Sequence, residues 1–346
     1  LVEDMGLVPG NRVLLRGANS PMLAACWLGV VKAGGIAVGT MPLLRARELQ
    51  PIVDKARVTH ALCDRRLAGE LAATQAQCPT LAKVLHYGAH DAPDELEARM
   101  VAKPATFDDV KTAADDTVLI AFTSGTTGVP KGTMHFHRDV MAACACWPPH
   151  VLRPTADDVF IGSPPLAFTF GLGGLLLFPL AVGASTVLIE KATPEALLPA
   201  IAQYRASVVF TSPTAYRAMA AHAKDHDLTS LRKCVSAGEA LPAATRQLWK
   251  DTTGLEMIDG IGSTELLHIF ISADEAHAKP GATGVPVPGY QACVLDDEGR
   301  PLPKGRVGRL AVKGPTGCRY LADERQRNYV QHGWNVTGDA YLIDDD

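Results

Sequence analysis

The feature that most constrains the fold of this chain is a regular alternation of strand-like and helix-like runs. In the first third of the sequence these runs occupy residues 12–15, 22–32, 35–38, 46–56 and 60–63. Strand, helix and strand in succession are typical of βαβ units, whose strands lie parallel in one sheet. The alternation resumes further along, where strand-like runs occupy residues 118–122, 159–161, 186–189, 207–211 and 233–236. The sequence therefore predicts an α/β protein with layered subdomains and mostly parallel sheets.

Changes in composition and in the pattern of strand-like runs along the chain predict three subdomains. Residues 88–114 are polar and acidic, which indicates a surface connection, and after about residue 279 short β-like runs alternate with turns. We expect an α/β subdomain at residues 1–110, a second at 111–278, and a small β-rich, barrel-like subdomain at 279–346. Because the chain begins at Leu1 and not at a methionine, the first subdomain is expected to be truncated at its N-terminus.

Charge and composition argue against several classes of function. Lys and Arg number 33 against 37 Asp and Glu, a formal net charge of −4, and the absence of a basic block argues against nucleic-acid and membrane binding. The apolar run 171–189 is divided by Pro179, Gly183 and Ser185, which favours a buried helix followed by a strand over a membrane span. The eight scattered cysteines form no CxxC pair, which predicts free thiols and a cytoplasmic location. We therefore expect a protein that acts on small molecules.

The most informative motif is residues 123–132, Thr-Ser-Gly-Thr-Thr-Gly-Val-Pro-Lys-Gly, directly after the strand-like run 118–122. Its glycines allow a tight turn whose N–H groups point at phosphate oxygens, the hydroxyls add donors, and Lys131 adds a positive charge. It is not a Walker loop, because Pro130 and Gly132 stand where that motif needs Gly and Ser or Thr. A polyphosphate-binding loop is therefore favoured over a P-loop NTPase and over a plain surface loop.

This motif resembles the phosphate loop of the adenylate-forming superfamily of acyl-CoA ligases, luciferases and peptide-synthetase adenylation domains. Three further segments match in the family's order: Ser-Ala-Gly-Glu-Ala-Leu-Pro at 236–242, Asp-Gly-Ile-Gly-Ser-Thr-Glu at 259–265, and Trp-Asn-Val-Thr-Gly-Asp at 334–339. The resemblance implies the fold of the family's large domain, ATP and Mg²⁺ as cofactors, and coenzyme A as a co-substrate. It also implies that the family's smaller C-terminal domain, which carries a lysine, is absent here and that this chain alone has impaired activity.

The resemblance assigns roles residue by residue. Glu265 is implied as the Mg²⁺ ligand, Thr264 as a contact to the α-phosphate, and Lys131 as a contact to the β- and γ-phosphates. These three are the expected catalytic residues, and Asp339 is implied to accept both ribose hydroxyls. The other implied nucleotide-binding residues are Thr123, Ser124, Gly125, Thr126, Thr127 and Gly128 in the loop, and Gly238, Glu239, Ala240, Asp259, Gly260 and Ile261 around the adenine. Taken alone, Glu265 would be interpreted as a solvated side chain and Asp339 as part of a turn.

Within the superfamily, residues 259–270 and 313–320 look closest to benzoate-CoA and 2-aminobenzoate-CoA ligases. The matching acid-pocket positions are Thr169, Phe170, Phe178, Ala237, Gly262, His268 and Ile269. Aromatic and small residues together would form a flat slot for a planar ring. Benzoate ligases tend to carry Tyr where Phe170 stands, which leaves the accepted ring substituents open. Without the family context, Phe178 and His268 would be interpreted as ordinary core residues.

The expected reaction is ATP-dependent activation of a benzoate- or 2-aminobenzoate-type acid to an acyl-AMP, followed by transfer to coenzyme A. Two alternatives stay open: an adenylation domain that loads a carrier protein, and a truncated fragment that only binds nucleotide and aryl acid. A homodimer also stays open. No zinc is expected, because His135 and His137 lack neighbouring Cys or carboxylate side chains and favour packing at the start of a helix.

Overall fold

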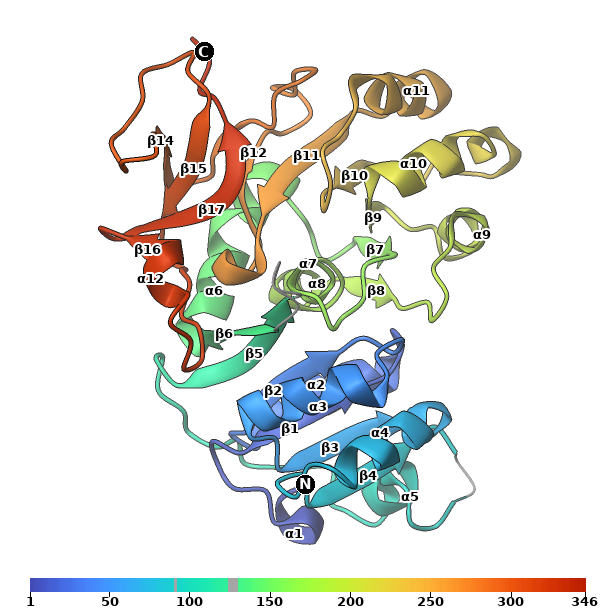
Figure 1. Ribbon diagram of the computed structural model, residues 1–346. Helices are drawn as coiled ribbons and strands as arrows, with labels where there is room; N and C mark the ends of the chain where they lie inside the picture. Colours follow the sequence, from blue (N-terminus) through green and yellow to red (C-terminus); the bar gives the residue numbers. More distant parts are fainter. Residues whose placement is uncertain (90–91, 124–129) are drawn as a thin grey trace. The chain divides into compact units, whose positions relative to one another are not determined.

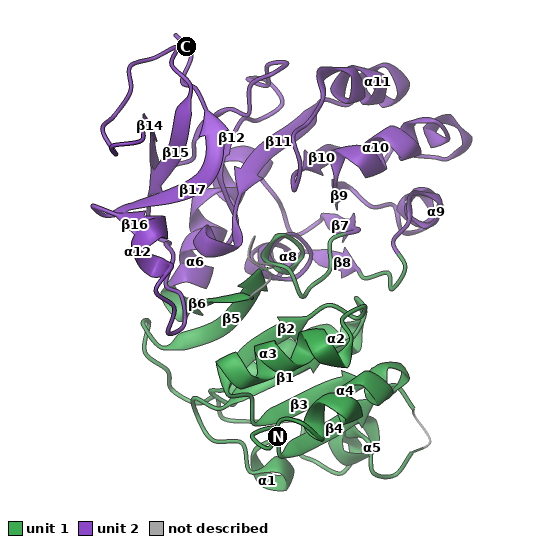
Figure 2. Ribbon diagram, viewed as in Figure 1, with its two compact units in different colours: residues 1–138, 164–172, 188–191 green, residues 139–163, 173–187, 192–346 purple. Residues whose placement is uncertain are grey.

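The computed structural model describes residues 1–89, 92–123 and 130–346 (Figure 1). The chain divides into two compact units, shown in different colours in Figure 2. The first unit comprises Leu1–Arg138, Pro164–Leu172 and Leu188–Lys191, and the second comprises Asp139–Ser163, Gly173–Val187 and Ala192–Asp346. The predicted phosphate-loop residues Ser124, Gly125, Thr126, Thr127 and Gly128 lie outside the described residues.

The first unit is built on one six-stranded sheet with the order β4-β3-β1-β2-β5-β6 (Figure 1). Its strands are β1 (Arg12–Arg16), β2 (Ile36–Thr40), β3 (His60–Asp64), β4 (Lys83–Tyr87), β5 (Thr117–Thr123) and β6 (Lys131–Phe136). Its helices are α1 (Val2–Met5), α2 (Pro21–Lys32), α3 (Ala46–Ala56), η1 (Arg65–Leu67), α4 (Ala68–Gln75), α5 (Leu96–Val101) and α7 (Thr169–Leu172). The first five strands are parallel, and only β6 runs antiparallel, beside β5.

The second unit contains a seven-stranded sheet with the order β13-β12-β11-β10-β9-β7-β8. Its strands are β7 (Val159–Gly162), β8 (Ser185–Val187), β9 (Val208–Thr211), β10 (Lys233–Ser236), β11 (Met257–Gly262), β12 (Ile269–Ser272) and β13 (Val285–Pro286). Five neighbouring strands are parallel, namely β7, β8, β9, β10 and β11. Strands β12 and β13 extend the sheet in antiparallel pairings. The accompanying helices are η2 (Pro148–Leu152), η3 (Gly173–Leu177), α8 (Phe178–Val182), α9 (Pro194–Tyr204), α10 (Pro213–Ala220), η4 (Ala223–Asp225), α11 (Ala243–Thr253) and η5 (Thr264–Leu266).

The end of the chain forms a four-stranded antiparallel sheet with the order β14-β15-β17-β16. Its strands are β14 (Gln291–Leu295), β15 (Gly308–Lys313), β16 (Val330–Gln331) and β17 (Trp334–Tyr341), and α12 (Gln326–Tyr329) precedes β16. The prediction of layered, mostly parallel sheets followed by a small β-rich part is confirmed.

Local sequence explains where several helices begin. At α2 the Ser20 hydroxyl accepts a hydrogen bond from the N–H of Leu23, and Pro21 occupies the first turn. The same arrangement recurs at α10, where Ser212 accepts from the N–H of Ala215 and Pro213 follows it. A serine cap satisfies an otherwise unpaired N–H, and proline fits the first turn because it has no N–H to lose. Both helices follow the preceding strand of their sheet through a short connection.

Strand β5 belongs to the first sheet, although its residues follow the expected boundary at residue 110. Ala37 of β2 pairs with Leu119 of β5, so β5 continues the first sheet instead of opening a second one. The polar connection contains α5 and returns the chain to the far edge of the same sheet. His135 also differs from expectation, because it is a buried residue of β6, whereas His137 is the first residue of α6 (His137–Cys146). The three-part division at 110 and 278 stays a prediction.

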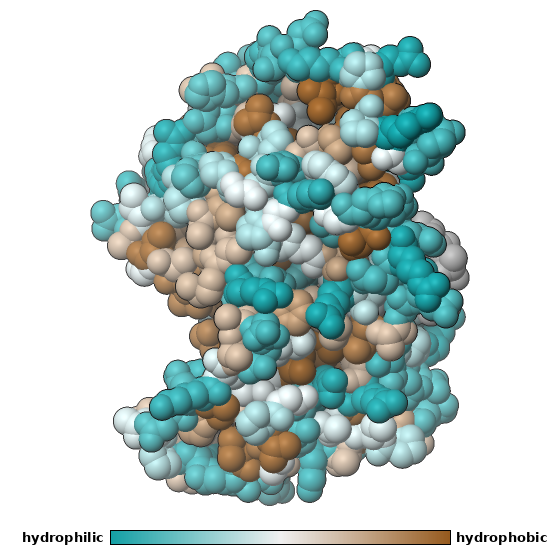
Figure 3. All heavy atoms as spheres, turned by 90° about the vertical axis from the view of Figure 1, so that its left-hand side faces the viewer, coloured by the Kyte–Doolittle hydropathy of each residue, from teal (hydrophilic) through white to brown (hydrophobic). Residues whose placement is uncertain are grey.

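The apolar run 171–189 contains helical segments of α7, η3 and α8, followed by the short strand β8. The prediction of a helix followed by a strand is confirmed. Within the described ranges, no helix has both the length and the apolar character needed to span a bilayer. The face shown in Figure 3 is mainly hydrophilic, and its hydrophobic patches are separate.

Candidate functional site

Four buried rings form a cluster in the second unit. The rings of Phe178 and His268 meet edge to face, with 4.5 Å between their centroids. Trp147 lies 5.7 Å from each of them, and Phe210 lies 6.0 Å from Trp147. These separations are typical of favourable aromatic pairs. The sequence prediction named Phe178 and His268 but missed Trp147 and Phe210, because neither belongs to a motif that marks the site.

Two glycines allow this cluster to close. A Cβ on Gly173 would lie 2.4 Å from Cδ2 of His268, and one on Gly262 would lie 2.6 Å from the carbonyl oxygen of His268. Gly262 ends β11 and pairs with Ile269 at the start of β12, so the chain doubles back on itself around His268. Ala237 directly follows β10, the neighbour of β11. Gly262 and Ala237 therefore lie at the carboxyl ends of β11 and β10, which are parallel strands. Proteins of the α/β class commonly bind ligands at such strand ends.

The second unit thus carries five of the seven predicted acid-pocket residues, namely Phe178, Ala237, Gly262, His268 and Ile269. Thr169 and Phe170 lie in α7, which belongs to the first unit. Thr169 is buried and Phe170 is half-buried.

Glu265 lies in the short helix η5, inside the turn that joins β11 to β12. The Ser263 hydroxyl accepts a hydrogen bond from the N–H of Leu266 and so caps this turn. Although it is a carboxylate, Glu265 is only 7% exposed. The hydroxyl of Tyr320 donates a hydrogen bond of 2.5 Å to its Oε1. The pKa of Tyr320 is raised well above its ordinary value, first by burial and then by this hydrogen bond to a carboxylate. The phenol therefore keeps its proton and remains a donor.

The predicted adenine wall lies on β11 and on the segment after β10. Burial raises the pKa of Asp259 to about 6, although the Gly260 N–H and the nearby Arg246 act in the opposite direction. The residues that follow Asp259 along β11, Gly260 and Ile261, are buried and half-buried. A carboxyl group with such a pKa changes its charge near pH 6.

The segment after β10 is exposed at Gly238, Glu239 and Ala240. Gly238 has a φ of +94°, a left-handed conformation that favours glycine. The Glu239 carboxylate accepts a hydrogen bond of 2.8 Å from the N–H of Thr214. The Thr214 side chain and then this N–H lower the pKa of Glu239. Because Thr214 lies in the first turn of α10, Glu239 also stabilises the start of that helix.

Asp339 is an exposed residue of β17. Its negative charge and that of Asp259 both contribute to raising the pKa of Tyr341, for which burial is the largest cause. The predicted ribose ligand and the predicted adenine neighbour therefore lie close to the same phenol. Thr264, the predicted phosphate contact, is half-buried beside Glu265 in η5.

In the first unit, Thr123 ends β5 and Lys131 begins β6, and the two residues pair across the antiparallel ladder. The ends of the predicted phosphate loop are thus held opposite each other by a strand pair. Both residues are half-buried.

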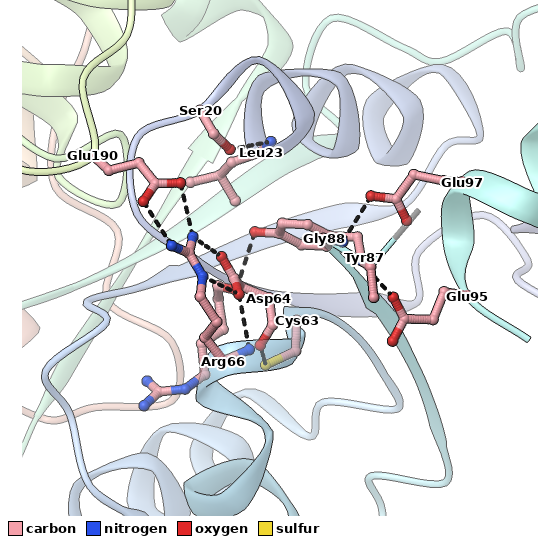
Figure 4. Close-up of polar contacts among 12 residues, drawn as sticks. Ser20, Leu23, Cys63, Asp64, Arg66, Tyr87, Gly88, Glu95, Glu97 and Glu190 are labelled. Atoms are coloured by element: carbon pink, nitrogen blue, oxygen red, sulfur yellow. Dashed lines mark hydrogen bonds and ion pairs between the residues drawn. The ribbon is translucent and has the colours of Figure 1, made fainter. Parts of the chain in front are cut away.

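A second polar cluster lies at the carboxyl ends of β3 and β4, and no sequence motif had indicated it. Figure 4 shows Arg66 between the carboxylates of Asp64 and Glu190, to which its guanidinium donates hydrogen bonds. Nearby, Glu97 accepts a hydrogen bond from the N–H of Gly88. The hydrogen bond from Arg66 lowers the pKa of Asp64. These contacts connect strand ends to the segment Leu188–Lys191, which indicates a structural role.

Known proteins resemble the chain over nearly its whole length. It is 32% identical to the benzoate–CoA ligase of Thauera aromatica, covering 100% of this chain and 67% of that protein. It is also 32% identical to the anthranilate–CoA ligase of Pseudomonas aeruginosa, covering 98% of this chain and 66% of the relative. The chain therefore spans about two thirds of the length of these curated relatives. The crystal structure of the anthranilate CoA ligase AuaEII in complex with anthranoyl-AMP superposes with a TM-score of 0.95 at 34% identity, covering 100% of this chain and 68% of AuaEII.

The family described as AMP-binding enzyme matches residues 1–320. Since this match takes in all but the last 26 of 346 residues, and the motifs at 123–132 and 259–265 fall inside it, the chain belongs to the AMP-binding enzyme family.

Proposed function

We propose that this protein activates an aromatic carboxylic acid of the benzoate or 2-aminobenzoate type with ATP, and that the acyl group then passes to coenzyme A. The observation that carries the proposal is the buried ring cluster of Trp147, Phe178 and His268 at the end of the turn that holds Glu265. An apolar, aromatic wall beside a carboxylate turn suits a planar acid whose reacting group meets a nucleotide. The relatives named above act on this class of acid.

The proposed reaction has two steps. A carboxylate oxygen of the acid attacks the α-phosphorus of ATP, the bond to the bridging oxygen breaks, and pyrophosphate leaves with acyl-AMP as the product. The sulfur of coenzyme A then attacks the acyl carbon, the thiol loses its proton, and AMP leaves. Neither step requires a protein nucleophile. The protein contributes positioning of the reactants and stabilisation of charge at phosphorus.

The nucleotide roles follow the family motifs onto residues of this chain. Thr264 would donate its hydroxyl to the α-phosphate, and Asp339 would accept hydrogen bonds from the ribose hydroxyls. Asp259, in the predicted adenine wall, would accept a hydrogen bond from the adenine amino group. Lys131 would supply positive charge to the outer phosphates, together with the loop that lies outside the described residues.

The implied Mg²⁺ fits the carboxylate of Glu265. This ion commonly binds one or two carboxylates together with substrate phosphates, and it prefers oxygen ligands. Among the residues that the structure describes, no group of three or more His, Cys, Asp or Glu side chains could hold a metal by itself. Glu265 would therefore hold Mg²⁺ jointly with ATP, and the bound ion would neutralise phosphate charge.

Binding of acyl-sulfamoyl adenosines, which are stable analogues of acyl-AMP, tests the acid class directly. We expect the benzoyl and 2-aminobenzoyl compounds to bind the chain at least about tenfold more tightly than the hexanoyl compound, since about 1.4 kcal/mol of ring burial and stacking is lost with an alkyl chain. Equal affinities would contradict the aromatic assignment.

A second assay tests the chemistry. ATP–pyrophosphate exchange should depend on benzoate, 2-aminobenzoate or a hydroxybenzoate and not on short fatty acids. Formation of an aryl-CoA ester, followed in parallel, separates a CoA ligase from a domain that loads a carrier protein. Analogue binding without any exchange would instead identify a fragment that only binds nucleotide and aryl acid.

A further inference from the structure

The segment between β15 and α12 holds the Glu265 turn at two points. The Thr316 hydroxyl donates a hydrogen bond of 2.7 Å to the carbonyl oxygen of Leu266, and the Tyr320 hydroxyl donates one of 2.5 Å to Oε1 of Glu265. Thr316 and Tyr320 are 2% and 5% exposed, so water competes little with either bond. The turn is thus fixed through its backbone and through its carboxylate.

The segment that carries Tyr320 is itself firmly anchored. The side-chain oxygen of Gln326 accepts the N–H of Tyr320 at 2.7 Å, and its nitrogen donates to the carbonyl oxygen of Cys318 at 3.0 Å. The Asn335 amide accepts the N–H of Cys318 at 2.8 Å and donates to the carbonyl oxygen of Val312 at 3.1 Å. Two buried or half-buried amides therefore hold the backbone on both sides of residue 319. The phenol of Tyr320 approaches Glu265 from a rigid support.

The turn needs such support because its backbone is strained. Leu267 has φ 74° and ψ −45°, a conformation that residues other than glycine rarely adopt. Such strain persists only where surrounding contacts over-determine the conformation, and it is concentrated at functional sites. Here the contacts are the Thr316 hydroxyl on the Leu266 carbonyl and the Ser263 hydroxyl on the Leu266 N–H.

We infer that Tyr320 is a positioning residue for divalent-cation binding, because it fixes the rotation of the Glu265 carboxylate. This inference rests on the proposed role of Glu265 as the cation ligand. Groups that donate hydrogen bonds to a ligating carboxylate orient it, and their loss commonly weakens metal binding about 10- to 100-fold. A carboxylate whose rotation is fixed by a phenol presents one geometry to a cation. A fixed geometry suits Mg²⁺, which demands near-ideal octahedral coordination, whereas Ca²⁺ accepts more variable coordination.

The test measures Mn²⁺ binding by electron paramagnetic resonance, with the full chain and α,β-methylene-ATP, so that no turnover is needed. Tyr320→Phe removes only the hydroxyl and is expected to raise the Kd for Mn²⁺ by about tenfold or more. In the same variant, the concentrations of Mg²⁺ and of Ca²⁺ that displace half of the bound Mn²⁺ should become more similar. A Kd within about twofold of the parent protein, with the difference between these two concentrations unchanged, would overturn the positioning role.

The matched control is Tyr216→Phe. Tyr216 is fully buried in the seven-stranded sheet region, and its hydroxyl donates to the carbonyl oxygens of Val209 and Val235. This substitution removes another buried phenol hydroxyl, one that makes its hydrogen bonds away from Glu265, so it should lower the melting temperature without changing the Kd for Mn²⁺. A parallel rise in the Kd for both variants would mean that general destabilisation explains the effect and would overturn the inference.

A double-mutant cycle separates this inference from the proposed function. If Tyr320 acts through Glu265, Tyr320→Phe should weaken Mn²⁺ binding no further once Glu265→Gln is present, whereas additive losses would overturn the inference. If Glu265→Gln leaves Mn²⁺ binding unchanged, the proposed ligand is wrong and the inference falls with it. If Glu265→Gln weakens binding and Tyr320→Phe does not, only the positioning role is wrong.

Gln326→Met provides a second variant should Tyr320→Phe fail to fold. It keeps the phenol but removes both side-chain hydrogen bonds that hold the backbone at residues 318 and 320. A smaller rise in the Kd for Mn²⁺ is expected, because the phenol is then less firmly supported. An unchanged Kd in this folded variant would count against the inference.

Discussion

The imidazole of His268 stands edge-on to the ring of Phe178, with 4.5 Å between the centroids and 73° between the ring planes. The two residues are separated by 90 positions in the sequence, yet both belong to the second unit and both are buried. Their contact depends on the absence of a side chain at Gly173, which faces both rings. The shape of the proposed acid site is therefore sensitive to single methyl groups.

Gly173→Ala tests this dependence. The added Cβ would lie 2.4 Å from the His268 ring and 3.1 Å from the Phe178 ring, so the imidazole must move. We expect a loss of about 1–3 kcal/mol in the free energy of unfolding and a changed order of affinity among aromatic acyl-sulfamoyl adenosines. Gly69→Ala is the control, because a Cβ there meets nothing within 4 Å. An unchanged order of affinity with Gly173→Ala would place the acid elsewhere.

Phe170→Ala tests the contribution of α7. Phe170 is half-buried, and the resemblance to the family predicts that it contacts the aryl ring. Loss of one aromatic contact should weaken binding of benzoyl-sulfamoyl adenosine by about tenfold, or about 1.4 kcal/mol, in a calorimetric titration. Phe168→Ala provides the comparison, since Phe168 lies two residues earlier and is 46% exposed. Equal effects of the two substitutions would argue against a specific role for Phe170.

Asp259→Asn should stabilise the ligand-free protein at neutral pH. Burial raises the pKa of Asp259 from 3.8 to about 6, so between these pH values the folded chain holds a proton that the unfolded chain has lost. The free energy of unfolding therefore falls as pH rises through this window, and the full penalty is present above it. Asparagine removes the charge, and we expect a gain of about 1–2 kcal/mol at pH 8 that disappears near pH 4.

Urea denaturation of Asp259→Asn at pH 4, 6 and 8 measures this gain. Asp297→Asn, in an exposed turn, should show no such pH-dependent difference. A stability loss at pH 8 would show that the carboxylate is stabilised in the folded state. Since Asp259 is also a proposed adenine neighbour, nucleotide affinity of the same variant should be measured separately.

Asp158→Asn should have the opposite effect on stability. Burial acts to raise the pKa of Asp158, but hydrogen bonds from Arg232, Ser207 and the N–H of Thr155 outweigh it and lower the pKa to about 2. The stabilisation is complete above pH 3.8 and is lost as pH falls toward 2. At pH 7 we expect a loss of about 1–2 kcal/mol, because the Asp158 side chain is buried but that of Arg232 is 36% exposed, so water screens part of the interaction.

Thermal unfolding between pH 7 and pH 3 measures the Asp158→Asn effect, and the difference from the parent protein should shrink at the acid end. Asp296→Asn is the control, because Asp296 pairs with Arg300, whose side chain is 72% exposed. Exposed pairs contribute about 0–1 kcal/mol. If both variants lost the same stability, the special role of the Asp158–Arg232 pair would be wrong.

Much of the secondary structure could be predicted because it depends on local pattern. The run 46–56 coincides with α3, and the strand-like run at 233–236 coincides with β10. Periodicity of apolar residues reports which face of a segment is buried. The family motifs likewise predicted residues of the nucleotide and acid sites, and those roles stay predictions.

Local pattern does not identify the partner against which a buried face packs. It therefore did not predict that β5 would join β2, 82 residues away at the Ala37–Leu119 pair, or that Trp147 would meet His268. Such pairings are decided by the closure of long segments and by the fit of side chains, neither of which leaves a periodic signal.

By itself, then, the sequence determined the α/β class and most strand and helix positions, and it predicted roles for motif residues such as Glu265, because each of these is encoded within one segment. Only the tertiary structure decided what surrounds those residues. The phenol of Tyr320 reaches Glu265 across 55 positions, and it does so because the amides of Gln326 and Asn335 anchor its segment. These contacts form only once distant segments share one folded core, since each hydrogen bond needs both partners buried and aligned.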